Sequence, residues 1–89
     1  MNDATGIKTI GFDDIRVGEG LEFKDISDEE VRSYMFARTR VVVDCPIALR
    51  VSDSGSHYVI DDEGVVHCVP KGWVSLSWRN KPGKLHVRF

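Results

Sequence analysis

Apolar and polar residues alternate with a period of two over the second half of the chain. The run from residue 73 to 79 shows this most clearly: Val74, Leu76 and Trp78 fall on one face, and Ser75 and Ser77 fall between them. Successive side chains of a β-strand point to opposite faces of the sheet, whereas a helix repeats every 3.6 residues. The pattern therefore predicts half-buried strands.

Short segments rich in Gly, Pro, Asp, Asn and Ser separate these runs, as is typical of turns. The predicted strands cover residues 47–51, 57–60, 65–69, 73–79 and 85–89, with turns at 53–56, 61–64, 70–72 and 80–83. Gly64 suits the left-handed position of its turn. Regular spacing of this kind predicts an antiparallel β-meander over about residues 40–89, strongly curved or closed as a small barrel. The runs Ile7–Ile10 and Leu21–Lys24 predict two further short strands.

A helix signal precedes the meander. Ser27 and Glu30 have the spacing of a capping box, in which each side chain bonds the other residue's backbone N–H. An apolar stripe at helical spacing follows: Val31, Tyr34 and Met35. We expect a short helix over about residues 28–37, packed on the meander, which makes the expected fold class α+β.

The length of 89 residues predicts one domain, residues 1–89, with residues 1–6 frayed at the surface. No apolar run approaches the roughly 20 residues that a membrane-spanning helix needs, and no secretory signal begins the chain. Two cysteines are too few for a disulfide scaffold. The composition therefore predicts a cytoplasmic protein without membrane contact.

Charge is distributed unevenly along the chain. The first 30 residues contain nine acidic and three basic residues, whereas the last 26 contain five basic residues and no acidic one. Polarity of this kind bears on which partners a protein attracts rather than on its chemistry. It is the main sequence feature that points toward function.

The acidic N-terminal third predicts a negatively charged binding surface. Its members are Asp13, Asp14, Glu19, Glu22 and Glu29. Such a surface can engage a basic region of a larger protein or nucleoprotein and speed association by electrostatic steering. We therefore expect a small non-enzymatic binding protein, an inhibitor or accessory protein of the kind that phages and other mobile elements encode.

A nucleic-acid-binding β module is the alternative hypothesis. Basic residues and one aromatic residue of the C-terminal half could share a sheet face, with cations on phosphates and the ring stacked on a base. These residues are Arg50, Lys71, Trp73, Arg79, Lys81, Lys84 and Arg88. The net charge of −2 argues against this hypothesis, because dedicated nucleic-acid binders are usually basic.

Catalytic, metal and cofactor signatures are weak. The histidines and cysteines follow none of the usual paired zinc spacings: Cys45, His57, His67, Cys68 and His86. His67 and Cys68 are adjacent on a predicted strand and point to opposite faces. A loop with Asp53, Ser54 and Ser56 is more typical of a turn than of a catalytic triad. We expect no metal, no cofactor and no enzymatic activity.

A second copy of the chain is a further partner that the sequence allows. The stretch from Leu85 to Phe89 is apolar at every second position. A strand at the edge of a meander leaves backbone groups unpaired, and two such edges can pair across a two-fold axis. The C-terminal stretch therefore predicts an edge suited to homodimer formation.

Overall fold

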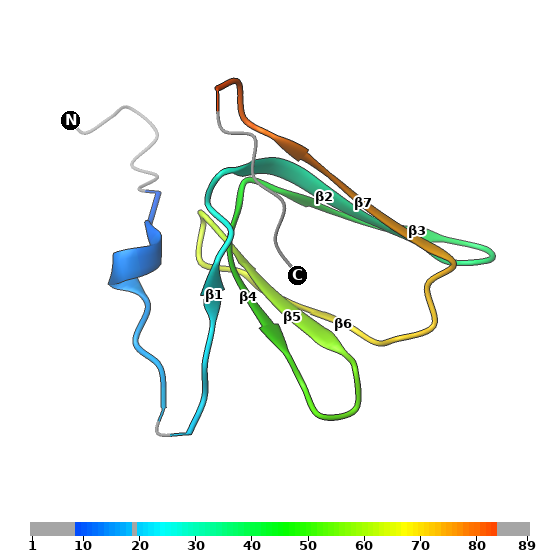
Figure 1. Ribbon diagram of the computed structural model, residues 1–89, viewed down its shortest axis with the longest axis horizontal. Helices are drawn as coiled ribbons and strands as arrows, with labels where there is room; N and C mark the ends of the chain where they lie inside the picture. Colours follow the sequence, from blue (N-terminus) through cyan, green and yellow to red (C-terminus); the bar gives the residue numbers. More distant parts are fainter. Residues whose placement is uncertain (1–8, 19, 84–89) are drawn as a thin grey trace.

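A computed structural model describes residues 9–18 and 20–83, and this part of the chain forms two antiparallel β-sheets (Figure 1). The four-stranded sheet has the order β1-β4-β5-β6, and the three-stranded sheet has the order β3-β2-β7. The strands are β1 (Lys24–Asp25), β2 (Glu29–Met35), β3 (Arg40–Asp44), β4 (Pro46–Val51), β5 (His57–Asp61), β6 (Val66–Val69) and β7 (Ser75–Asn80). A 3-10 turn, η1 (Phe12–Asp14), precedes them.

The two sheets pack face to face around the main hydrophobic core. Tyr34 and Val43 from the three-stranded sheet meet Leu49, Val59 and Val69 from the four-stranded sheet, and all five side chains are buried. Burying both inner faces in this way is the usual source of stability for two packed β layers.

The N-terminal segment forms a third, irregular layer on the other side of the four-stranded sheet (Figure 1). It packs apolar side chains against a second cluster of buried residues on that sheet. The cluster is Ile47, Ala48 and Ile60, and the covering residues are Ile10, Phe12, Ile15 and Phe23. The four-stranded sheet is therefore covered on both faces, which explains why β4 is apolar over most of its length.

The expected α+β fold is wrong, because the described residues contain no α-helix and their strands form two separate sheets rather than a continuous meander or closed barrel. The segment predicted as a helix is instead β2, the central strand of its sheet. Pairing with β3 on one side and β7 on the other satisfies its backbone groups. A ten-residue helix has few tertiary contacts to offset this, so the sheet is preferred.

The capping-box residues have other partners. Asp25 Oδ1 accepts hydrogen bonds from both the backbone N–H and the hydroxyl of Ser27, at 2.9 and 2.6 Å. Ser27 therefore caps no helix and lies in the turn before β2. The carboxylate of Glu30 lies 3.8 Å from the Arg79 guanidinium of the neighbouring strand β7.

A β-bulge near the start of β2 places two buried residues three positions apart. The register against β7 shifts between Glu29 and Val31, so Glu30 is the extra residue. The shift moves Glu29 to the same face as Arg32, although a regular strand would place residues three apart on opposite faces. Buried positions three apart are thus produced by a bulged strand.

Cys45 carries the chain from one sheet to the other. It lies between β3 and β4 with φ of 52°, and among the described residues it is the sole non-glycine with positive φ. Its N–H donates to the carbonyl of Glu30 in the three-stranded sheet, and its carbonyl accepts from the N–H of Asp62, which follows β5. One residue therefore forms the corner between β3 and β4.

Most strand and turn predictions for the second half are confirmed within one or two residues. The strands predicted at 47–51, 57–60, 65–69 and 73–79 correspond to β4, β5, β6 and β7, and Gly64 has φ of 86°. The run from Leu21 to Lys24 is a strand only at its last residue, and residues 9–10 form none. The predictions for residues 1–8 and 85–89 lie outside the described residues.

Candidate functional site

A buried ion pair lies between the two sheets. The Arg32 Nε and Nη2 groups each donate to one carboxylate oxygen of Glu29 at 2.8 Å, in a bidentate arrangement. The two residues are only 2% and 4% exposed. Although burial alone would lower the pKa of Arg32, its hydrogen bonds to Glu29 and Tyr34 raise it above the usual value. Arg32 therefore remains charged and is neutralised by Glu29.

The pair continues into a chain of hydrogen bonds that crosses to the other sheet. Arg32 Nη1 donates to the Tyr34 hydroxyl at 3.2 Å, and that hydroxyl lies 2.6 Å from His57 Nδ1. Tyr34 is fully buried, and no buried side-chain polar atom of the described residues lacks a partner. Because the Tyr34 oxygen accepts from Arg32, donation of its own hydrogen to His57 Nδ1 satisfies both groups. We assign the bond in this direction, which leaves the imidazole proton on Nε2.

His57 is held in the neutral form by its surroundings. Burial, followed by the positive charges of Arg32 and Lys24, lowers the pKa of His57 below 6.5. The rings of Tyr34 and Trp73 contact it edge-on, with centroids 5.4 and 4.7 Å away. The imidazole is thus fixed in orientation and in tautomer.

An apolar cavity of about 290 Å³ opens beside this chain of hydrogen bonds, between the two sheets. Leu49, Val51 and His57 line it from the four-stranded sheet, and Arg32, Leu76 and Trp78 line it from the other; Trp73 closes it from the segment before β7. The Arg32 guanidinium carbon lies 5.0 Å from the Trp78 ring centre, so its charge faces both Glu29 and an aromatic surface.

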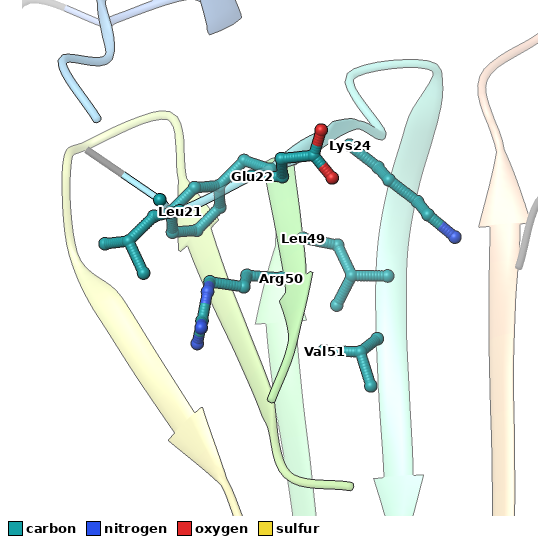
Figure 2. A pocket seen from close by; sticks show the side chains of 8 residues that line it. Leu21, Glu22, Lys24, Leu49, Arg50 and Val51 are labelled. Carbon is teal, nitrogen blue, oxygen red and sulfur yellow. The ribbon is translucent and has the colours of Figure 1, made fainter. Parts of the chain in front are cut away.

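A larger, more open groove of about 820 Å³ lies where β4 extends beyond β1. The ladder between β1 and β4 includes only Lys24 with Leu49 and Asp25 with Ala48, so the last residues of β4 are not paired on this side. Residues 20–24 form one wall of the groove and residues 49–51 the other. In Figure 2, Leu49 and Val51 point to one side of the strand and Arg50 to the other.

The groove combines apolar and charged side chains. Leu21 is 44% exposed and Val51 is 49% exposed, so both present apolar surface to the outside. Glu22, Lys24 and Arg50 line the same groove. Protein-binding surfaces commonly combine exposed apolar side chains with charged ones.

The residues of the predicted acidic surface are not all on the outside. Asp13 and Asp14 are exposed on η1, where Asp14 Oδ2 accepts the N–H of Gly11 at 2.8 Å. Glu22 is exposed and lines the groove. Glu29 is buried against Arg32 and adds nothing to an exposed surface. Glu19 lies outside the described residues.

The structure separates the residues of the predicted basic face. Lys71 and Trp73 precede β7, whereas Arg79 and Lys81 lie at its far end, roughly 17–20 Å away for a strand of this length. Trp73 packs against the main core rather than facing outward. Arg50 lies over the Tyr58 ring, with 5.9 Å between its guanidinium carbon and the ring centre. Lys84 and Arg88 lie outside the described residues.

The scattered histidines and cysteines have separate surroundings. His67 Nε2 lies 2.9 Å from Asp61 Oδ2, while His57 is engaged by Tyr34. Burial and the nearby Asp62 carboxylate raise the pKa of the Cys45 thiol, which opposes nucleophilic activation. Within residues 9–18 and 20–83, no three potential metal ligands gather. His86 lies outside this range.

The serine-rich loop forms the hairpin between β4 and β5. Ser52 Oγ accepts the N–H of Ser56 at 3.1 Å and lies 2.9 Å from Ser54 Oγ. These bonds close the turn, while His57 faces Tyr34. The loop therefore has the hydrogen bonding of a turn, as its composition predicts.

Sequence reasoning missed the cavity and the polar chain, meaning the hydrogen-bonded side chains of Glu29, Arg32, Tyr34 and His57. The helix prediction covers Arg32 and Tyr34, and the alternation of residues 73–79 places Trp78 on one face with Val74 and Leu76 without indicating a cavity. The signal available in the sequence is a Glu and an Arg three residues apart, in a run that also contains Val and Tyr. It is ambiguous, because the same spacing describes an exposed ion pair on a helix.

No protein family matches this sequence, and comparisons with curated proteins and with solved structures find no significant match. Across the described residues, no helix has the length and apolar character needed to traverse a bilayer. The geometry of the groove, the cavity and the polar chain is therefore the basis for assigning a function.

Proposed function

We propose that this protein is a small non-enzymatic binding protein that acts on a larger macromolecular partner through its charged N-terminal layer, as an inhibitor or accessory protein. One observation carries the proposal: the groove between residues 20–24 and the end of β4 presents Leu21 and Val51 beside Glu22, Lys24 and Arg50. Exposed apolar side chains beside charged ones favour association with another macromolecule.

The N-terminal layer supplies the acidic part of this surface. Asp13 is exposed on η1, and Glu22 lies in the groove wall. Both belong to the segment that covers the outer face of the four-stranded sheet (Figure 1). Their carboxylates support steering toward a basic partner surface.

Charge reversal of these two residues tests the proposal. We expect the Asp13→Lys/Glu22→Lys variant of the full chain to recover at least about tenfold less partner from lysate of the native host. Asp14 is left unchanged, because its carboxylate bonds the N–H of Gly11 at the start of η1. Asp44→Lys is the control, since Asp44 is an exposed acid on β3 in the other sheet.

The same experiment separates the two classes of partner. If the charge-reversed variant and the control recover the same partner equally well, the proposal is wrong. A parallel sample is digested with nuclease before capture. Loss of the partner on digestion alone would instead support the nucleic-acid hypothesis, which gains little from a Trp73 ring that packs against the core.

A further inference from the structure

We infer that the cavity between the two sheets is a binding site for a small, neutral aromatic molecule of about two fused rings that carries a hydrogen-bond acceptor. The cavity shares Leu49 and Val51 with the groove, but the inference does not depend on the proposed macromolecular function. Its basis is the size of the cavity, the nature of its walls and the Nε2–H donor that the bond between Tyr34 and Nδ1 leaves on His57.

The size and lining of the cavity determine the shape of the ligand. Apolar cavities of about 150 Å³ stay dry and bind benzene, so a cavity of about 290 Å³ has room for a bicyclic ring. Trp73 and Trp78 provide aromatic walls, and Leu49, Val51 and Leu76 provide aliphatic ones. Flat aromatic molecules gain most from such surroundings, through area burial and edge or stacking contacts.

The charges around the cavity favour a neutral ligand. Arg32 is the one cation among the described residues that line it, and both oxygens of the Glu29 carboxylate already engage that guanidinium. An anion entering here would lose its hydration without gaining an uncompensated positive charge. A neutral ring has no such cost.

His57 supplies the polar contact. Its Nδ1 accepts from Tyr34, so Nε2–H is the remaining hydrogen-bonding group of a ring that lines the cavity. A ring nitrogen or carbonyl of the ligand can accept from it. Small-molecule sites typically combine apolar walls with few placed polar groups, and this cavity has that composition.

Quinoline and naphthalene make a matched pair of probes, because they have the same shape and only quinoline has a ring acceptor. Binding is followed at about pH 7.5 by the indole N–H signals of Trp73 and Trp78, the two tryptophans of the chain. We expect both probes to shift these signals and quinoline to bind about three- to tenfold more tightly. If neither probe shifts them up to its solubility limit, the inference is overturned.

Two substitutions test the contacts separately. His57→Asn places an amide oxygen near the position of Nδ1, so it keeps an acceptor for Tyr34 and removes Nε2–H; the preference for quinoline should disappear. Val51→Trp should fill the cavity and abolish binding of both probes. Val66→Trp is the matched control on β6, whose exposed residue does not line the cavity.

A charged probe tests whether the cavity prefers a neutral ligand to an anion. We expect 2-naphthoate, the anionic counterpart, to bind more weakly than quinoline. If it binds more tightly, or if Val51→Trp leaves quinoline binding unchanged while its spectrum remains that of a folded protein, the cavity is not a neutral aromatic site and the inference fails.

Discussion

The Tyr34 hydroxyl lies 2.6 Å from Nδ1 of His57 and joins the two sheets by a side-chain hydrogen bond. Tyr34 belongs to the central strand β2, and His57 is the first residue of β5. The bond links a charged pair in the interior to a ring at the cavity. It therefore couples the packing of the sheets to the state of one titratable group.

Tyr34→Phe removes this link without changing the shape of the core. Arg32 Nη1 and His57 Nδ1 each lose a partner, and an unsatisfied buried group costs about 1–3 kcal/mol. We expect the free energy of unfolding in urea to fall by this amount. In nitrogen NMR of the imidazole, the single Nε2–H tautomer should give way to a mixture. An unchanged tautomer would contradict the assigned direction of the bond.

Glu29→Gln tests the buried ion pair. The substitution leaves the Arg32 charge uncompensated at a site that is 2% exposed, so we expect a loss of about 3–5 kcal/mol or failure to fold. The double variant Glu29→Leu/Arg32→Met should be much closer to the parent protein, because removing both charges also removes their desolvation cost. Urea unfolding of both variants gives the comparison. A double variant less stable than the single one would refute this account.

The strands of the second half follow from local chemistry, and this explains why their prediction succeeds. Alternation marks β7, and turn-forming residues such as Gly64 mark the ends of strands. Neither feature depends on distant contacts. The division into two sheets could not be predicted in the same way. The chain passes from one sheet to the other before β2, at Cys45 and before β7, and nothing in the Cys45 side chain indicates its left-handed backbone conformation.

The helix prediction failed because its evidence was also local. The spacing of Ser27 and Glu30 describes a possible cap, but β2 gains hydrogen-bonded neighbours on both sides. The bulge at Glu30 then places Glu29 beside Arg32 in the interior. A surface defined from charge alone could not exclude Glu29, since burial of a carboxylate depends on its partner. The exposed members Asp13, Asp14 and Glu22 were predicted from charge.

The shifted pKa of His57 predicts that stability falls in mildly acidic solution. Because the folded-state pKa lies below the ordinary value of 6.5, the unfolded chain takes up this proton at a higher pH than the folded protein does. The contribution of neutral His57 to the free energy of unfolding is complete above about pH 6.5 and is lost as the pH falls toward the folded-state pKa. Urea midpoints between about pH 7.5 and pH 5 should therefore decrease.

His57→Asn is the control for this pH dependence. It should flatten the decrease, because it removes the imidazole of His57. Asp61 acts in a lower range: although burial alone would raise its pKa, hydrogen bonds from His67, Val65 and Glu63 lower it below 3.8. If His57→Asn keeps the full decrease of the urea midpoint between about pH 6.5 and 5, another group is responsible.

The corner at Cys45 predicts an unusual order of tolerated residues. A φ of 52° is strained for a side chain with a Cβ and most strained for a β-branched one, whereas glycine adopts it freely. We expect Cys45→Gly to match or exceed the parent in stability and Cys45→Val to lose about 1–2 kcal/mol.

Cys68 provides the control, because it lies within β6 without positive φ. There the order should reverse, with Val favoured over Gly as strand propensity dictates. Urea unfolding of the four variants decides the question, and the same order at both positions would show that backbone strain does not govern the corner.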